Sequence, residues 1–534
     1  MDKLHPSPKF RPATWSFGDL AAEAGRALAS RRDLAAGLLL GAFFFLFLAL
    51  IQFSTADLPD NDGFYHIKLA YLMRTEGLKP AFPWLPLSIL NPREFYDHHF
   101  LFHAALMPFT FGDLRLGAKW AAVGFATLAF LSAWILLKNQ RIPLAALWAL
   151  GLAAVSEAFL YRMSITRAQS LSLAVLMIAL DWLLRKKYTR LAGLGFVYVW
   201  LYDAFPLLLA VAGAYVLAGW VVEKRLDLRP LLFTGLGTAL GLLINPYFPH
   251  NIVFAVRHIL PKLTEATAIS VGNEWYPYDT AQLLDNSFLA LAAFLGGALA
   301  LGLSGKRMDR RTLLLFSLAA LFGLMLFQAR RFVEYFPAFS LLFAAFAWSP
   351  LLEAAARETE PASGEPKPRK RRWSFTPARW GAVALLLALV PGLWSSYNGA
   401  RESLLRSKPH QTYALASAWL AENTPAGARV FQTDWDDFPR LFFYNTHNTY
   451  LAGLDPTYLL LYDEELYHLW VDITRGEVER PSAPILEEFG ARYVISDLQH
   501  GDFLDQAGSD PGLVEVYRDE YAAVFQVMNE EAAE

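Results

Sequence analysis

About eleven apolar runs, most of roughly 17 to 20 residues, dominate the first three quarters of this 534-residue chain. An α-helix needs about 20 residues to cross a hydrocarbon core of about 30 Å. Only 18% of the residues are charged, against about 25% in a typical soluble protein. The sequence therefore predicts an α-helical polytopic membrane protein. The predicted spans are 34–53, 116–137, 142–160, 168–185, 191–203, 205–222, 230–246, 286–304, 312–329, 332–349 and 379–397, with 191–203 and 205–222 either separate or one broken pair.

Basic residues test this arrangement because Lys and Arg accumulate on the cytoplasmic side of a membrane. With the N-terminus inside and eleven spans, every basic cluster falls on one side. The first run follows Arg31 and Arg32 and has no small-residue cleavage site after it, which favours an uncleaved span over a signal peptide. We therefore expect a multi-pass protein of the cytoplasmic (inner) membrane. The clusters are Lys3, Lys9, Arg11, Arg26, Arg31 and Arg32; Lys138 and Arg141; Arg185, Lys186, Lys187 and Arg190; Lys224, Arg225 and Arg229; Lys306, Arg307, Arg310 and Arg311; and the loop 357–379.

The chain divides into a transmembrane domain, 1–397, and a soluble outer, periplasmic domain, 398–534. From residue 401 onward there are 24 Asp and Glu and 9 Lys and Arg, a net charge of −15. Apolar patterns there predict an α/β domain with helices near 410–422 and 457–473 and strands near 428–433, 492–497, 513–518 and 522–527. The basic, Pro-rich loop 350–378 is either a disordered cytoplasmic linker near anionic lipid or a binding motif.

Two long outer loops, 54–115 and 245–285, exceed what a simple connection needs. The first opens with Asp60-Asn61-Asp62-Gly63, directly after an apolar span. Carboxylates at a bilayer edge persist when they serve a metal, a proton or a substrate, although Asp-Asn-Asp-Gly is also good turn chemistry. Tyr65 and His66 then open a predicted amphipathic, interfacial helix. We interpret Asp60 and Asp62 as candidate catalytic carboxylates.

The same loop carries Asp97, His98 and His99, about 35 residues after Asp62. With Asp60, Asp62 and Glu274 these side chains could hold a divalent cation, Mg²⁺ or Mn²⁺. In the alternative, His99 and His103, which are four residues apart, only line an interfacial helix. The chain has no cysteine, which excludes disulfides and thiolate ligands. The predicted metal ligands are Asp62, Asp97, His98, His99 and Glu274.

Four arginines lie at predicted outer ends of spans, on the side that lacks basic clusters. Guanidinium groups match phosphate oxygens, so a lipid phosphate is a natural partner. Ion pairs of Arg162 with Glu157, or of Arg331 with Glu334, are the alternative for one arginine of each pair. The candidate phosphate-binding residues are Arg162, Arg167, Arg330 and Arg331.

A further acidic and aromatic segment, Gln432 to Pro439, follows a predicted strand of the outer domain. Loops at strand ends often bind ligands, whereas the alternative is a turn with exposed acids. We expect this segment to contribute Asp434, Trp435 and Asp436 to substrate binding.

The order of these motifs resembles the GT-C superfamily of integral-membrane glycosyltransferases, most of all the catalytic subunits of oligosaccharyltransferases. Asp60 and Asp62 with Tyr65 and His66 are similar to the acidic motif of their first outer loop. Ser270-Val271-Gly272-Asn273-Glu274, followed by Trp275, is similar to their Ser-Val-Ser-Glu segment. Thr433 to Phe438 occupies the place of their Trp-Trp-Asp-Tyr-Gly motif. The segment 161–167 is basic where those enzymes carry an acidic pair, which favours an acceptor other than protein.

The resemblance implies a GT-C glycosyltransferase of the cell envelope that moves a sugar or oligosaccharide from a polyprenyl-phosphate donor to an acceptor on the outer face. The implied partners are that donor, membrane lipid, and an acceptor glycan, lipid or protein, with no nucleic acid. Tyr65, His66, Glu274 and Trp275 would bind substrate beside Asp434, Trp435 and Asp436. A transporter or flippase, and an assembly subunit for polyprenyl-linked glycans, are the alternatives.

Overall fold

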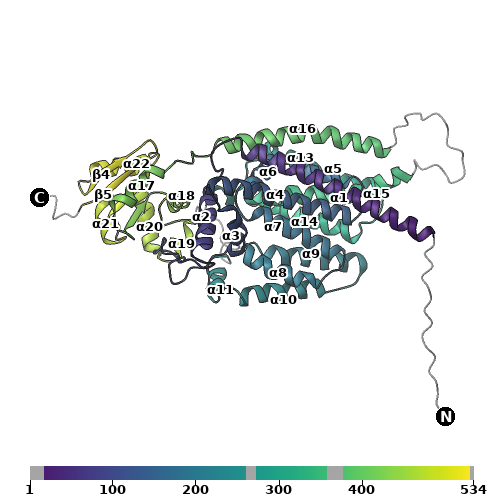
Figure 1. Ribbon diagram of the computed structural model, residues 1–534, viewed down its shortest axis with the longest axis horizontal. Helices are drawn as coiled ribbons and strands as arrows, with labels where there is room; N and C mark the ends of the chain where they lie inside the picture. The colour runs from purple at the N-terminus through teal and green to yellow at the C-terminus, as the bar shows by residue number, and fades with distance from the viewer. Residues whose placement is uncertain (1–16, 260–271, 358–376, 529–534) are drawn as a thin grey trace, which may run out of the picture.

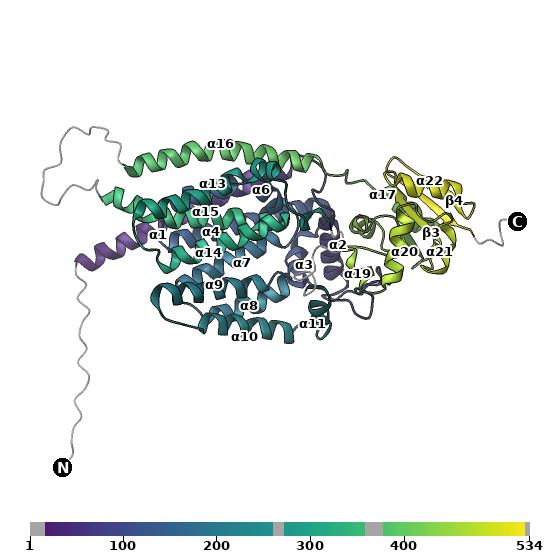
Figure 2. The ribbon, with the colours of Figure 1, turned by 180° about the vertical axis from the view of Figure 1, so that it is seen from behind.

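The computed structural model describes residues 17–259, 272–357 and 377–528. A long bundle of helices carries a smaller α/β domain at one end, and both ribbon views show the same order of parts (Figures 1 and 2). The basic residues Lys3, Lys9 and Arg11, the segment Ser270-Val271 and most of the loop 350–378 lie outside the described residues.

Helices of the bundle coincide with all eleven predicted apolar runs, one of which is broken. Residues 202–205 separate two of them, which settles 191–203 and 205–222 as two helices. The bundle helices are α1 (Phe17–Gln52), α4 (Leu114–Asn139), α5 (Ala145–Leu150), α6 (Glu157–Ser164), α7 (Gln169–Leu184), α8 (Arg190–Leu201), α9 (Pro206–Glu223), α10 (Arg229–Leu243), α13 (Thr280–Ser304), α14 (Arg310–Gln328), α15 (Phe336–Arg357) and α16 (Pro377–Leu405).

Six helices of the described residues are long and apolar enough to cross a membrane, and one bent pair makes a possible seventh. This makes the chain a multi-pass membrane protein, while the count of eleven spans stays a prediction. The predicted span 142–160 is not a single straight helix. There α5, the 3-10 turn η2 (Gly151–Ala153) and α6 bend by 80°, because Ser156 accepts a hydrogen bond from the Phe159 N–H and starts a new helix.

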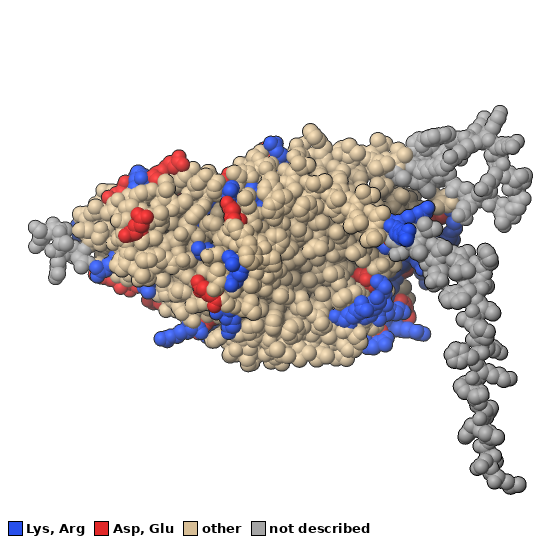
Figure 3. Space-filling view, in the orientation of Figure 1, with Lys and Arg blue, Asp and Glu red and all other residues tan. Residues whose placement is uncertain are grey.

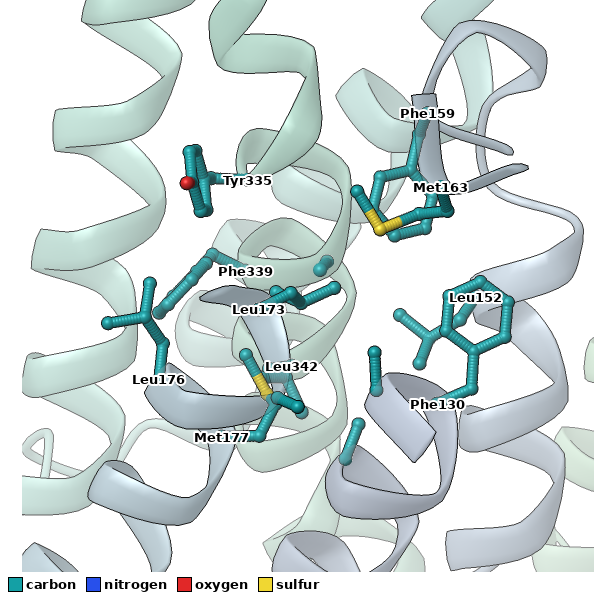
Figure 4. Packing of buried hydrophobic residues seen from close by; sticks show 14 of the residues in the cluster. Phe130, Leu152, Phe159, Met163, Leu173, Leu176, Met177, Tyr335, Phe339 and Leu342 are labelled. Carbon is teal, nitrogen blue, oxygen red and sulfur yellow. The ribbon is translucent and has the colours of Figure 1, made fainter. Parts of the chain in front are cut away.

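The bundle core is packed from large apolar side chains of α4, α6, α7 and α15 (Figure 4). The rings of Phe130 and Phe159 stack with centroids 5.8 Å apart. In lipid, helices associate through close packing rather than through water exclusion, which favours small residues at contacts. Gly237 is such a residue, since a Cβ there would lie 1.9 Å from the Ala192 carbonyl oxygen where α10 meets α8.

Charge is divided between the two ends of the molecule. Lys and Arg gather at the end of the bundle remote from the α/β domain, and a broad uncharged surface separates them from that domain (Figure 3). Loops that contribute exposed basic residues to this end include 185–190, 224–225 and 306–307. This distribution is the one expected when the remote end faces the cytoplasm.

The C-terminal domain is built on a five-stranded sheet with strand order β2-β1-β3-β5-β4. β1 runs parallel to β2 and β3, whereas β5 runs antiparallel to β3 and β4. The four predicted strands and the helix near 410–422 are present, but the predicted helix 457–473 is two helices. Its elements are α17 (Ala414–Asn423), β1 (Arg429–Gln432), η6 (Trp435–Asp437), α18 (Phe438–Tyr444), β2 (Thr449–Tyr450), α19 (Thr457–Leu460), α20 (Glu464–Thr474), α21 (Ser482–Glu487), β3 (Tyr493–Asp497), α22 (Gly501–Ser509), β4 (Leu513–Arg518) and β5 (Ala522–Val527).

The first predicted long loop connects α1 to α4, the second connects α10 to α13, and the first contacts the C-terminal domain through Asn61 and Trp84. Within the first, α2 packs against α18 and α3, and most of its side chains are buried. The helix is present, but the prediction that it is amphipathic and interfacial was wrong, because two protein surfaces cover α2. The elements of the two loops are α2 (Asn61–Glu76), α3 (Phe100–Leu106), η1 (Met107–Phe109), α11 (His250–Phe254), the π-helical turn η3 (Ala255–Ile259) and η4 (Asn273–Trp275), and the short turn η5 (Arg330–Glu334) links α14 to α15.

A reporter active only outside the cytoplasm, fused after Glu534, is expected to be active, because the basic end lies opposite the C-terminal domain. The same reporter inserted between Lys224 and Arg225 should be silent. An inserted, expressed C-terminal fusion that stays silent would overturn the predicted orientation.

Candidate functional site

A pocket of about 540 Å³ lies where the bundle end, the two connecting loops and the C-terminal domain meet. Most of the predicted site residues line it, although they come from distant parts of the chain. Those residues are Asp60, Asp62, Tyr65, His66, His98, His99, Arg167, Glu274, Trp275, Arg331, Asp434, Trp435 and Asp436.

Arg167, between α6 and α7, stands at the centre of the acidic motif. Its guanidinium holds Asp60 through Nε and through Nη2, the latter 2.8 Å from Oδ1. The same Nη2 lies 3.0 Å from Asp62 Oδ2. Asp60 is thus occupied by a two-point ion pair. Burial, opposed by Arg167 and reinforced by Asp60, raises the pKa of the second carboxyl, Asp62, to about 7.

Glu274 lies among three arginines. Its carboxylate is 2.9 Å from Arg162 Nη2, 3.6 Å from Arg167 Nη1 and 3.7 Å from Arg331 Nη1. Burial favours the neutral acid, but the three guanidinium groups outweigh it and lower the pKa of Glu274 well below its usual range. One anionic group therefore already occupies the place where the arginines converge.

The arginines differ in what they face. Arg162 is held by the buried Glu334 as well as by Glu274 and does not line the pocket. Arg331 lies over the Trp275 ring, 4.2 Å from its centroid, and lines the pocket. Arg330 instead donates to the Pro277 carbonyl, away from the pocket.

Two of the predicted ion pairs are replaced by others. Arg162 pairs with Glu334 rather than with Glu157, and Arg331 pairs with Glu274 rather than with Glu334. The packing of α6 against η5 explains the exchange, because it brings Glu334 beside Arg162.

The C-terminal domain closes the pocket with η6. Asp434 caps this turn by accepting the Asp436 N–H, and the Asp436 carboxylate accepts from Asn61 Nδ2 at 2.6 Å. Burial, together with the nearby charges of Asp62 and Asp434, raises the pKa of Asp436 to about 8. The loop after β1 therefore meets the acidic motif of α2 directly.

Four of the predicted metal ligands, Asp62, His98, His99 and Glu274, line the pocket, whereas Asp97 does not. Asp97 instead accepts a hydrogen bond from His103 Nδ1 at 2.8 Å. Among the described residues there is no group of three or more Asp, Glu and His side chains arranged to hold a metal ion. Between Asp60, Asp62 and Glu274 the positive charge is that of Arg167. A bound cation stays a prediction, and no chemistry below depends on one.

Several pocket residues escaped the sequence analysis. Asp203, His258, Asp455 and Tyr458 also line the pocket. Asp203 ends an apolar run in the same way as the residues that were singled out, so it carried a usable signal. His258 and Asp455 carried none, since only the folding of two distant segments brings them within 3.8 Å of each other.

Comparison with protein-family models and with curated proteins finds no match. Among solved structures, the oligosaccharyltransferase of Archaeoglobus fulgidus in its apo form superposes with a TM-score of 0.64 at 15% identity, covering 89% of this chain and 71% of that one. ArnT from Cupriavidus metallidurans superposes with a TM-score of 0.54 at 17% identity, covering 91% and 97%. Both are GT-C glycosyltransferases. The chain has the GT-C fold.

This is the fold that the resemblance drawn from the order of the motifs implied. Archaeal AglB has also been solved with an inhibitory peptide and a dolichol-phosphate, and it superposes with a TM-score of 0.62 at 15% identity, covering 89% of this chain and 71% of that one. The ArnT structure contains undecaprenyl phosphate. At such identities the comparison concerns the fold, and the chemistry has to be argued from the pocket.

Proposed function

We propose that this protein is a membrane glycosyltransferase that moves a sugar or oligosaccharide from a polyprenyl-phosphate donor to an acceptor at the outer face of the inner membrane. The observation that carries the proposal is one pocket, at the end of a membrane bundle, that is lined by both arginines and carboxylates. Arg167 and Arg331 line its bundle side, whereas Asp434 and Asp436 come from the C-terminal domain. A lipid phosphate and a polar acceptor would meet between them.

The arginines are assigned to the phosphate that leaves. Guanidinium groups stabilise the negative charge that develops when the bond between the anomeric carbon and the phosphate oxygen breaks. Arg331 reaches the pocket from η5, and Arg167 reaches it from the short connection between α6 and α7. Asp60 holds Arg167 in place through its two-point contact.

Asp62 is assigned to the acceptor. The acceptor hydroxyl oxygen forms the new bond to the anomeric carbon, its proton passes to the Asp62 carboxylate, and the polyprenyl phosphate leaves with the electron pair. A carboxyl group with a pKa near 7 is well matched to this proton transfer at neutral pH. The aromatic faces of Trp275 and Trp435 in the same pocket suit the apolar faces of sugar rings.

The test is transfer by purified protein in lipid nanodiscs, with polyprenyl-phosphate sugars as donors and glycans, lipid glycans and peptides as acceptors. Release of polyprenyl phosphate that depends on protein and acceptor supports the proposal. Movement of a fluorescent polyprenyl-linked sugar across vesicle membranes, with no transfer product, would favour the transporter alternative.

Glu274→Gln is expected to strengthen binding of undecaprenyl phosphate about five- to thirtyfold, or about 1–2 kcal/mol. The substitution removes the negative charge that three arginines now surround, so the lipid phosphate no longer competes with it. Binding is measured by thermal shift or by displacement of a labelled lipid. Glu479→Gln serves as the control, because Glu479 is an exposed carboxyl of the C-terminal domain that does not line the pocket. Unchanged or weaker binding by the Glu274 variant would show that the phosphate does not bind where the carboxylate lies.

A further inference from the structure

A buried chain of three side chains runs from α3 to the pocket. Asp97 Oδ2 lies 2.8 Å from His103 Nδ1, and His103 Nε2 lies 2.7 Å from His66 Nδ1. Asp97 and His103 are 2% and 0% exposed. His66 is the member that lines the pocket. The proposed roles of Asp60, Asp62 and the arginines make no use of this chain.

The hydrogen bonds define an order of protons. A carboxylate only accepts, so His103 donates to Asp97 from Nδ1, and a neutral His103 is left with a lone pair on Nε2. His66 must then donate from its own Nδ1, which leaves the lone pair of His66 on Nε2. The hydrogen bond made by one ring nitrogen sets the state of the other.

The surroundings of His66 favour its neutral form. Burial is the main cause that lowers the pKa of His66 well below its usual range, and His103, Arg167 and His98 add to it. The ring of His99, on the turn before α3, lies 5.0 Å from that of His66 and is itself buried enough to have a lowered pKa. We therefore treat His66 as neutral, with Asp97 as the carboxylate at the other end of the hydrogen-bonded series.

We propose that His66 Nε2 is a dedicated hydrogen-bond acceptor for a substrate hydroxyl, and that Asp97 and His103 are positioning residues that hold His66 in the required tautomer. The inference rests on the proposed function in naming a sugar or acceptor hydroxyl as the donor. It adds a recognition rule, because a ring nitrogen that can only accept selects a hydroxyl over an ether or a carbonyl at that position.

The tautomer can be read without any activity. In protein labelled with ¹⁵N-histidine and held in nanodiscs, His66 is expected to show a protonated Nδ1 and an unprotonated Nε2 at neutral pH. His66→Gln assigns the signal by its loss, and His468→Gln, which changes an exposed histidine, should leave it in place. A protonated Nε2 on His66 in the wild-type protein would overturn the proposal.

Two variants test the positioning residues. His103→Phe removes the acceptor for His66 Nδ1, and Asp97→Asn changes the far end of the chain while keeping its size. At least one folded variant is expected to lose the wild-type His66 tautomer and, in the transfer assay, to raise KM about tenfold while changing kcat less than about threefold. If both variants fold and both keep the wild-type His66 tautomer, the positioning role is refuted. If no transfer is found with any donor, the proposed function fails. The NMR measurement of the His66 tautomer tests the positioning role separately.

Discussion

Asp62→Asn is expected to lower kcat by about 10²- to 10⁴-fold, the usual contribution of a positioned general base. Asn keeps the size and turn-forming character of Asp, but it cannot accept the hydroxyl proton. Asp62 lies 3.0 Å from Arg167 and lines the pocket, so removing its charge acts where acceptor and donor phosphate would meet. Binding of undecaprenyl phosphate should change little. Initial rates with saturating donor, together with lipid binding, measure both quantities.

The pH dependence of kcat, compared between the wild type and Asp62→Asn, tests whether the reaction needs the ionised form of Asp62. The reaction needs the Asp62 carboxylate, so wild-type kcat should rise as pH rises through the raised pKa of about 7 and level off above it. The residual activity of Asp62→Asn should lack this rise.

Matched changes on α2 separate catalysis from folding. Glu76→Gln alters an exposed carboxyl at the other end of the helix and should leave kcat unchanged. Asp60→Asn should reduce activity by an equal or smaller factor, since Asp60 acts by holding Arg167. Full turnover by the Asp60→Asn/Asp62→Asn double variant would show that this stretch is only a turn.

The helical architecture was predictable from sequence because lipid leaves a spanning segment few choices. Every backbone N–H and C=O must be bonded within the segment, so a long apolar run becomes a helix. The break before Ser156 was not predictable in the same way. Its neighbours are as apolar as a spanning helix, and the bend depends on the side chain of Ser156 bonding to Phe159 N–H and to Ser287 of α13.

The sequence predicted which residues belong to the site better than it predicted which of them form ion pairs with each other. Residues such as Asp62, Glu274 and Trp435 stood out because they lie in long loops or at a strand end, and all three line the pocket. The partner of Arg162 is Glu334, which is 172 positions away, rather than Glu157, which is five positions away. Long-range packing of α6 against η5 decides that choice, and local spacing carries no information about it.

The histidines show the same limit. The sequence left open whether Asp97 helps to bind a metal ion or His103 only lines an interfacial helix, yet the two meet in one buried hydrogen bond. The packing of α3 against α2 creates the contact; α2 also packs against α18 of the C-terminal domain and α4 of the bundle, and α3 packs against α8. A pattern of residue types in a loop indicates that chemistry is present, but the order of the partners comes from the tertiary structure.

Arg331→Lys is expected to weaken binding of undecaprenyl phosphate by about 1–3 kcal/mol, or roughly five- to 150-fold. Lysine keeps the positive charge but loses the planar fork that engages two phosphate oxygens and stacks on an aromatic ring. Arg331 lies over Trp275 and faces Glu274 within the pocket. Arg167→Lys should have an effect of similar size and should also free Asp60, so its loss of kcat should exceed that of Arg331→Lys.

The neighbouring arginine is the control for this prediction. Arg330→Lys changes the same residue type one position away, where the side chain donates to the Pro277 carbonyl and does not line the pocket. Equilibrium binding of labelled undecaprenyl phosphate in nanodiscs should therefore separate two adjacent substitutions, with Arg330→Lys close to wild type. Equal affinities for wild type, Arg331→Lys and Arg167→Lys would return both arginines to the role of ion-pair partners for Glu274 and Asp60, because only a bound phosphate makes the shape of the guanidinium group matter to lipid affinity.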